Sequence, residues 1–297
     1  MKRQIVGWLV LGLVLVGLGL VASEDCTETI TIASWNIQGL GVSTPQSRLD
    51  ALANTITAFD IVALQEIKGV EGMENLLERV EEAAGIDWDY VISPRVGSGG
   101  AAEHYVFLFR TDCVSYVEET SGVYPELHLD DFSREPFFAT FRAGEFDFTL
   151  ITVHITCGEL PGLRTEECER LQSVWSYVQA RDPLEDDLIL LGDFNRDSPG
   201  DSAFAPLEAM KLTVLLDVKG TRTTFGRTSA GGSWYDHIWI DATRTGSEFT
   251  GEVGAGLPIP EFNSAGTGCP ECLREVSDHC PVWAVFTTTA DDDPVCQ

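Results

Sequence analysis

The segment that most constrains this chain covers residues 188–195, an apolar run that ends in two polar side chains. Four consecutive aliphatic residues at 188–191 are typical of a strand that is buried on both faces. Asp193 and Asn195 follow at alternate positions, so in extended chain their side chains point to the same side. A carboxylate and an amide in this arrangement suit a hard metal ion and a hydrogen bond to a phosphate or an attacking water. A turn closed by Asp or Asn side chains explains the segment equally well. The choice between a functional site and a simple turn therefore depends on the rest of the sequence.

Polar residues end other predicted strands in the same way. Alternating or continuous apolar runs predict strands at 29–38, 60–66, 89–93, 104–110, 137–142, 146–154, 188–195, 223–225, 234–240 and 281–288. Apolar residues at helical spacing predict helices at 48–58, 72–84, 166–180 and 202–210. The Gly- and Pro-rich segment 251–268 is predicted to be a surface loop. This order indicates an α/β fold, in which sites gather at strand ends. The polar residues there are Asn36, Glu66, His154, Asp193, Asn195, Asp236, Asp278 and His279.

The chain divides into three parts. Residues 1–23 carry Lys2 and Arg3, a long apolar run and small residues before Glu24, which is the pattern of a secretory signal peptide. An uncleaved N-terminal membrane anchor is the alternative, and both place the remaining protein outside the cytoplasm. We expect residues 24–290 to form one domain and residues 291–297 to form an acidic C-terminal tail.

The eight cysteines agree with an exported protein, because an even number in such a chain favours disulfides. Cys157–Cys168 would close a short loop and Cys26–Cys296 would tie the two ends together, although spacing does not fix the connectivity. The CxxC motif at 269–272 resembles half of a zinc site, but no second CxxC or HxxxH pair accompanies it.

The formal net charge of −28 is unusual for a protein that would bind a polyanion. Such a surface repels nucleic acids at long range. The same charge also fits a protein that works at high salt or among divalent cations, where screening confines the repulsion to about 3 Å at 1 M salt. The net charge therefore indicates the salt conditions under which the protein works more than the reaction that it catalyses.

The acidic strand ends can form an oxygen-rich pocket. Oxygen ligands of this kind suit Mg²⁺, Mn²⁺ or Ca²⁺ better than zinc or copper. The candidate donors are the carboxylates of Glu66, Asp193, Asp236 and Asp278 and the amides of Asn36 and Asn195.

Two histidines, His154 and His279, can serve as base and acid if carboxylates orient them. Asp278 is adjacent to His279, but neighbours in extended chain point apart, so Asp236 is the candidate partner. Glu103 is the candidate partner of His154. Attack of water on a phosphate ester needs a neutral base, positive charge around the phosphoryl oxygens and an acid for the leaving group. The two histidines, their carboxylate partners and the acidic pocket together predict hydrolysis of a phosphoester.

Other hydrolytic chemistries fit less well. The chain has no nucleophile motif of the G-x-S-x-G kind, so a covalent serine route is not indicated. Glycoside hydrolysis uses two carboxylates but needs neither a metal nor a histidine pair.

Seven short motifs appear in a characteristic order. They are Trp35-Asn-Ile37, Leu64-Gln-Glu66, Arg134-Glu-Pro136, Thr152-Val-His154, Gly192-Asp-Phe-Asn195, Tyr235-Asp236 and Ser277-Asp-His279. This order resembles the endonuclease/exonuclease/phosphatase superfamily over almost the whole chain. Glu103 with the strand that follows it, and the segment 131–136, look most like the deoxyribonuclease I branch.

The resemblance implies a four-layer α/β sandwich of two mixed β-sheets flanked by helices. It also implies endonucleolytic hydrolysis of DNA with little sequence preference, dependence on Mg²⁺ or Mn²⁺ with Ca²⁺ as a possible second ion, and 5′-phosphate products. His279 would be the base, oriented by Asp236, and His154 the acid, paired with Glu103. The other implied site residues are the metal ligands Glu66, Asp278 and Asp193 and the substrate-binding Asn36, Asn195, Arg134 and Thr224.

Two departures from that branch leave rival functions open. Ala101 stands near the place of an expected minor-groove aromatic residue, and Lys68 replaces an arginine. Together with the acidic surface, the first departure favours a phosphodiesterase or phosphatase of the same superfamily that acts on phospholipids, inositol phosphates or nucleotides. A binding protein that has lost catalysis is a third possibility, against which the intact motifs argue. We expect a monomer without a stable protein partner.

Overall fold

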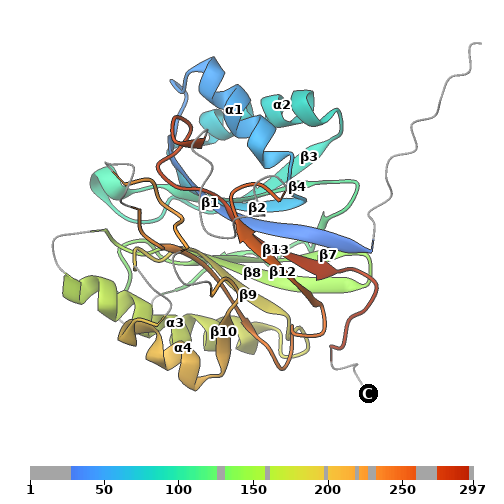
Figure 1. Ribbon diagram of the computed structural model, residues 1–297, viewed down its shortest axis with the longest axis vertical. Helices are drawn as coiled ribbons and strands as arrows, with labels where there is room; N and C mark the ends of the chain where they lie inside the picture. The colour runs from blue at the N-terminus through green and yellow to red at the C-terminus, as the bar shows by residue number, and fades with distance from the viewer. Residues whose placement is uncertain are drawn as a thin grey trace, which may run out of the picture.

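The computed structural model describes residues 28–125, 131–157, 161–196, 200–217, 221–226, 232–258 and 273–293. These residues form four layers, with two β-sheets packed face to face and helices on both outer faces (Figure 1). In Figure 1, α1 and α2 lie above the upper sheet, and α3 and α4 lie below the lower sheet. The four-layer α/β sandwich predicted from the sequence is therefore confirmed.

The upper sheet has six strands in the order β12-β13-β1-β2-β4-β3. β1 and β2 are parallel, and the other pairs are antiparallel. The strands are β1 (Thr29–Leu40), β2 (Ile61–Ile67), β3 (Trp88–Ile92), β4 (His104–Arg110), β12 (Phe249–Ala255) and β13 (Val282–Thr287).

The lower sheet follows the order β10-β11-β9-β8-β7-β5, and β6 also pairs with β7. Here β8 and β9 form the parallel pair, and the other pairs are antiparallel. The strands are β5 (Ser115–Tyr116), β6 (Gly122–Val123), β7 (Phe137–Ala143), β8 (Phe146–His154), β9 (Leu188–Asp193), β10 (Leu212–Val214) and β11 (Asp236–Asp241). Each sheet thus has one parallel pair whose carboxyl ends share an edge.

The helices cover the sheets with apolar faces. α1 buries Leu49, Leu52 and Ile56, which recur at helical spacing. α2 ends at Gly85, whose φ of +69° is a left-handed conformation that glycine adopts without strain. The helices are α1 (Gln46–Ile56), α2 (Val70–Ala84), α3 (Pro161–Arg181) and α4 (Ala205–Ala209), with 3₁₀ turns at Gly99–Ala101 and Ser202–Phe204.

Three apolar clusters fill the spaces between the four layers. The central cluster lies between the sheets and is rich in aromatic rings, including Phe107 and Phe137, whose centroids are 5.3 Å apart. A second cluster joins the upper sheet to α1 and α2, and a third joins the lower sheet to α3 and α4. Each sheet is therefore buried on both faces, which explains the continuous apolar run that precedes Asp193.

The structure differs from the sequence prediction in three segments. Residues 251–255 belong to the edge strand β12 instead of a loop; its Gly251, Gly254 and half-exposed side chains hide the strand pattern. α3 begins five residues before the predicted start at Glu166. The predicted strand at 223–225 is reduced to a single bridge between Thr224 and His279.

The cysteines also correct the prediction. Cys157 and Cys168 have free thiols, so the predicted Cys157–Cys168 disulfide is wrong. Their side chains face different environments, because Cys157 lines a cleft and Cys168 packs in the cluster beneath the lower sheet. Cys113 and Cys280 each take part in a disulfide bond. Four cysteines lie outside the described residues: Cys26, Cys269, Cys272 and Cys296.

The terminal segments are described only in part. The predicted signal peptide or anchor at 1–23 and residues 294–297 of the predicted tail lie outside the described residues. Among the helices of the described part, none is long and apolar enough to span a membrane.

Candidate active site

Strand alternation brings four polar side chains to the space between the sheets. In β1, Ile30 and Ile32 face the central cluster, and Asn36 lies on the same face at the strand's end. The same alternation holds in the lower sheet, where apolar residues two or four positions away face the central cluster. The lower-sheet residues placed in this way are His154 in β8, Asp193 in β9 and Asp236 in β11.

Glu66 reaches this space by a different route. Simple alternation would turn it toward the helices with Leu64, but its φ is +66°, and the register between β2 and β4 shifts at this point. Such bulges re-aim a side chain, and they store strain that the surrounding packing must hold. The Glu66 carboxylate lies instead next to Asn36, whose Nδ2 donates to Oε1 at 3.3 Å.

The polar strand ends meet in a cleft of about 570 Å³. Most of the predicted site residues line this cleft. Glu103 and Asp236 instead lie behind the two histidines, and Arg134 borders a neighbouring cavity of about 550 Å³. The predicted residues that line the cleft are Asn36, Glu66, His154, Asp193, Asn195, Thr224, Asp278 and His279.

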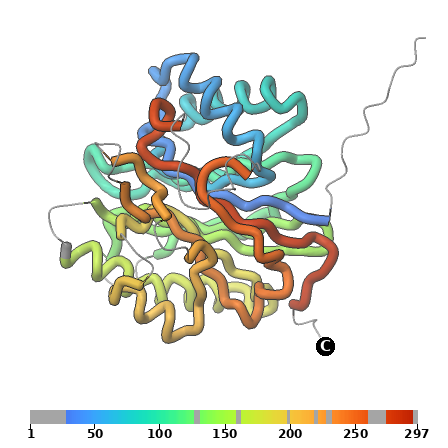
Figure 2. Tube along the Cα trace, in the orientation of Figure 1, coloured from blue at the N-terminus to red at the C-terminus, as the bar shows by residue number. Residues whose placement is uncertain are grey.

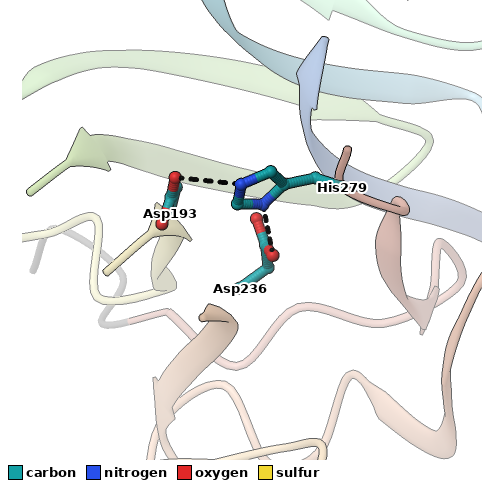
Figure 3. A group of neighbouring side chains, drawn as sticks. All are labelled: Asp193, Asp236 and His279. Atoms are coloured by element: carbon teal, nitrogen blue, oxygen red, sulfur yellow. Dashed lines mark hydrogen bonds and ion pairs between the residues drawn. The ribbon is translucent and has the colours of Figure 1, made fainter. Parts of the chain in front are cut away.

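His279 is held by the buried carboxylate of Asp236. Its Nδ1 lies 2.8 Å from Oδ2 of Asp236, and its Nε2 lies 3.6 Å from Oδ2 of Asp193, so the ring spans the two acids (Figure 3). Burial alone lowers the pKa of His279, but the charges of Asp236, Asp193 and Asp278 outweigh it and raise the pKa to about 10. This imidazole is therefore protonated at neutral pH unless positive charge offsets the surrounding carboxylates.

His154 forms the second pair, with Glu103. Its Nδ1 lies 2.8 Å from Oε1 of Glu103, which is 1% exposed. Burial raises the pKa of Glu103, but His154, Arg134 and Lys68 favour the charged form and together lower it. Tyr105 fixes the backbone here, since its hydroxyl accepts from the His154 N–H at 2.9 Å. The His154 ring is thus oriented by a buried, charged carboxylate.

Asp193 lies between the two pairs. Its Oδ1 accepts from the backbone N–H of Asn195 at 2.9 Å, and its Oδ2 accepts from Nδ2 of Asn36 at 3.1 Å. Gly192 permits this position, because a Cβ there would lie 2.1 Å from the carbonyl oxygen of Val153. Asn195 has a φ of +48° and donates from Nδ2 to the carbonyl of Ile155 at 2.9 Å. The Asp193 carboxylate is therefore fixed on both sides.

Glu66 and Asp278 are two carboxylates of the cleft that could hold a divalent cation. Both line the cleft; the Glu66 side chain is 26% exposed and Asp278 is exposed. Both lie within the electrostatic reach of Arg48, which donates to the carbonyls of Gln38 and Val276. Carboxylate and amide oxygens at the rim of a polar cleft fit Mg²⁺ or Mn²⁺. Asp193, the third predicted ligand, already accepts from both asparagines.

Arg134 and Thr224 have intramolecular partners that the sequence did not predict. Arg134 is 5% exposed and donates from Nε and Nη2 to the carbonyls of His154 and Ile155, at 2.9 and 3.2 Å. The Thr224 hydroxyl accepts from the N–H of Ser233 at 2.7 Å. Both residues therefore position the backbone around the histidines as well as bordering the cleft or its neighbouring cavity.

Several supporting residues were missed by sequence analysis. Gln65 is fully buried and links the sheets by donating to the hydroxyls of Ser34 and Thr152 at 3.1 and 3.0 Å. Arg48 and Tyr105 fix the backbone near the metal candidates and His154. A glutamine within the apolar strand next to Glu66 could have predicted the supporting role of Gln65. The sequence around Arg48 and Tyr105 contains no such indication of their roles.

Comparisons with known proteins agree with this geometry. The model of the endonuclease/exonuclease/phosphatase family matches residues 33–279. A deoxyribonuclease of Thioalkalivibrio sp. is 33% identical over 273 residues, covering 90% of this chain and 73% of the relative. Human deoxyribonuclease gamma is 30% identical over 284 residues, covering 89% and 88%. A solved family protein from Bacteroides thetaiotaomicron superposes with a TM-score of 0.59 at 19% identity, covering 91% and 98%.

The chain therefore belongs to the endonuclease/exonuclease/phosphatase family. Its relatives place it in the deoxyribonuclease I-like branch, and it is a phosphodiesterase of that branch. Divalent-metal dependence is general in this family, which agrees with the acidic cleft.

Proposed function

We propose that this protein is a secreted, divalent-metal-dependent endonuclease that hydrolyses DNA and leaves 5′-phosphate ends. The observation that carries the proposal is the pair of carboxylate-oriented histidines whose Nε2 atoms lie 3.6 Å from the same oxygen of Asp193. Two imidazoles that both approach one fixed acid supply a proton acceptor and a proton donor for a displacement at phosphorus. Relatives named deoxyribonuclease support DNA as the substrate.

In this mechanism His279 accepts a proton from the attacking water. The water oxygen forms the new bond to phosphorus, and the bond from phosphorus to the 3′-oxygen breaks. His154 gives its proton to that leaving oxygen, so the phosphate stays on the 5′ side. Asp236 holds the His279 ring in position, and Glu103 holds the His154 ring in position.

The charge around His279 determines when it can act. Three carboxylates favour its protonated form, so offsetting their charge lowers its pKa and frees the imidazole to accept a proton. A Mg²⁺ or Mn²⁺ ion held by Glu66 and Asp278 would neutralise charge on the phosphoryl oxygens, and Ca²⁺ is a second candidate. The side-chain amides of Asn36 and Asn195 and the carboxylate of Asp193 border the place for the phosphate.

The net charge of −28 is compatible with DNA under conditions that screen it. Divalent cations and salt limit the repulsion to short range. We infer low sequence specificity, because few described residues near the cleft are suited to read base edges. We also propose export by the N-terminal segment and action as a monomer.

The rival substrate class is a small phosphoester. The acidic surface favours it, because it repels DNA. Ala101 also favours it, because this residue stands near the place of the expected minor-groove aromatic residue; it lies in a 3₁₀ turn beside the Arg134 cavity. A mannosyl-6-phosphatase from Bacteroides thetaiotaomicron shares the fold with a TM-score of 0.57 at 20% identity, covering 87% of this chain and 99% of that one. This likeness concerns the fold alone.

A substrate panel separates the two. We expect kcat/KM for plasmid DNA in Mg²⁺ to exceed that for nitrophenyl phosphate, a nucleotide and an inositol phosphate by at least about a thousandfold. EDTA serves as the metal control and His279→Ala as the catalytic control. Faster hydrolysis of any small monoester than of DNA would overturn the proposal in favour of the rival.

A further inference from the structure

A second acidic site lies at the opposite end of β9 from the catalytic cleft. Glu185, Asp186 and Asp187 immediately precede β9, whereas Asp193 ends it. Six residues of extended chain separate Asp187 from Asp193, which corresponds to about 20 Å. The two sites therefore share a strand but no residue.

The C-terminal segment completes this second site. After β13 the red segment leaves the upper sheet and descends toward the lower sheet (Figures 1 and 2). Asp291 accepts from the N–H of Asp147 at 3.1 Å, and Asp293 accepts from the N–H of Asp186 at 2.9 Å. Part of the predicted acidic tail is thus held against the lower sheet.

The carboxylates of this second site converge closely enough to share cations. In three overlapping groups, one ligand oxygen from each residue lies within 4.8 Å of the others. The groups are Glu185 with Asp187 and Asp293, Asp147 with Asp291 and Asp293, and Asp186 with Asp187 and Asp292.

An independent observation marks the first group as a ligand site. Asp187 is 0% exposed, and neither of its carboxylate oxygens has a hydrogen-bond partner. Glu185 is 5% exposed; its Oε1 accepts from the Asp187 N–H at 2.8 Å, but its Oε2 has no partner. Buried carboxylates without partners are strongly unfavourable, and a coordinating cation removes that cost.

The nearby arginines do not neutralise this group. Arg142 pairs with Asp147 at 3.0 Å and Arg244 pairs with Asp186 at 3.1 Å, and no described ion pair reaches Glu185 or Asp187. Burial, together with the neighbouring acids, raises the pKa of Glu185 to about 9 and that of Asp187 to about 8. The Thr245 hydroxyl lies near enough to favour the charged form of Asp187, but it forms no hydrogen bond of normal geometry with the carboxylate and does not reverse this effect.

We propose that Glu185, Asp187 and Asp293 bind a divalent cation that fastens the C-terminal segment to the start of β9. Calcium fits better than magnesium, because it accepts six to eight oxygens in flexible geometry, including bidentate carboxylates. Asp147 and Asp291 lie beside Asp293 and add acidic oxygens to the same pocket. The site stabilises the fold and takes no part in cleavage.

The test measures calcium binding in a background that lacks the catalytic carboxylates. Isothermal titration of the Glu66→Gln/Asp278→Asn double variant should still show one Ca²⁺ bound per chain. Adding Asp187→Asn or Asp293→Asn to that background should abolish this binding. Glu118→Gln, which removes an exposed charge elsewhere, is the matched control and should leave it unchanged.

Thermal unfolding of the Glu66→Gln/Asp278→Asn background, taken here as the parent, provides a second readout, because a cation bound at any site of the folded protein raises the Tm and this background lacks the catalytic carboxylates. With Ca²⁺ at about a hundred times its dissociation constant, the Tm of the parent should rise by about 5 °C or more over its value in EDTA. Asp187→Asn should lose this rise yet unfold at a higher temperature than the parent in EDTA, because it replaces a buried carboxylate that has no partner without the cation. Three results would each overturn the proposal: calcium binding that is retained by Asp187→Asn and Asp293→Asn, no calcium binding by the parent, or an affinity for Mg²⁺ equal to that for Ca²⁺.

Discussion

The Nε2 atom of His279 lies 3.6 Å from Oδ2 of Asp193, and the Nε2 atom of His154 lies at the same distance from the same oxygen. The two histidines come from different parts of the sandwich, since His154 ends β8 of the lower sheet and His279 precedes β13 of the upper sheet. Each is fixed from behind by its own buried carboxylate. The site therefore presents two oriented imidazoles that both approach one oxygen of an immobile acid.

Replacing either histidine should remove catalysis while leaving the fold intact. We expect His154→Ala and His279→Ala each to reduce the rate of DNA cleavage by about 10²–10⁴-fold, the usual contribution of a general acid or base. Their circular dichroism spectra should match the parent. His104→Gln changes a histidine that bonds the carbonyl of Ser93 outside the cleft, and it should keep near-normal activity. A rate above a tenth of the parent in either alanine variant would contradict the assigned roles.

The protonation of His279 should depend on Asp236. In EDTA, the ¹H NMR titration of His279 should have its midpoint far above the ordinary 6.5, because the adjacent carboxylates raise its pKa to about 10. Asp236→Asn removes a charge and a hydrogen-bond acceptor that favour the protonated form, so the midpoint should move to lower pH.

The same pair should couple stability to pH. Because the folded protein holds the His279 proton up to about pH 10, whereas an unfolded histidine loses it near 6.5, this stabilisation is complete below pH 6.5 and fades as the pH rises toward 10. Asp236→Asn should weaken this loss of stability in urea unfolding at pH 6 and pH 9. An unchanged midpoint and an unchanged pH dependence in the variant would contradict the electrostatic account.

Metal dependence should reside in Glu66 and Asp278. We expect EDTA to abolish activity, and Glu66→Gln or Asp278→Asn to raise the Mg²⁺ concentration for half-maximal cleavage by at least about tenfold. Activity measured across a Mg²⁺ series gives this value directly. Glu71→Gln, which changes an exposed glutamate at the start of α2, is the matched control. If all three variants need the same Mg²⁺ concentration, the cation is held elsewhere.

The two free thiols should differ in reactivity. Cys157 is exposed and lines the cleft, whereas burial raises the pKa of Cys168 to about 12. Iodoacetamide should therefore alkylate Cys157 in the native protein and inhibit cleavage by obstructing the cleft, while Cys168 should react only after unfolding. Peptide mapping by mass spectrometry checks both sites. Cys157→Ser should resist this inhibition; inhibition of that variant at the same rate would show that another residue is responsible.

The sequence predicts the layers and most of the site because both follow from local patterns. Alternation along β1, β8, β9 and β11 determines which face a side chain occupies, so Asn36, His154, Asp193 and Asp236 could be grouped before their sheets were known. Alternation also excluded Asp278 as the orienting carboxylate of His279 and left Asp236 as the candidate. The motif resemblance then supplied the four-layer arrangement.

What could not be predicted depends on contacts between distant segments or on irregular backbone. The positive φ of Glu66 that turns its carboxylate into the cleft has no sequence marker. The buried position of Arg134 results from contacts between the segment before β7 and the end of β8, which the local sequence does not mark. The edge strand β12 was obscured by its glycines, and the acidic C-terminal segment gave no sign of where it docks.

The most direct test of the central claim is the chemistry of the ends left in DNA. Supercoiled plasmid is incubated with the protein and Mg²⁺, and the nicked circles are then treated with a DNA ligase, which requires a 5′-phosphate and a 3′-hydroxyl. The two-histidine mechanism predicts nicks that the ligase seals without prior phosphorylation, and no nicks with EDTA or with His279→Ala. The absence of nicks at every metal and salt concentration, or nicks that cannot be sealed until a kinase adds phosphate, would contradict it.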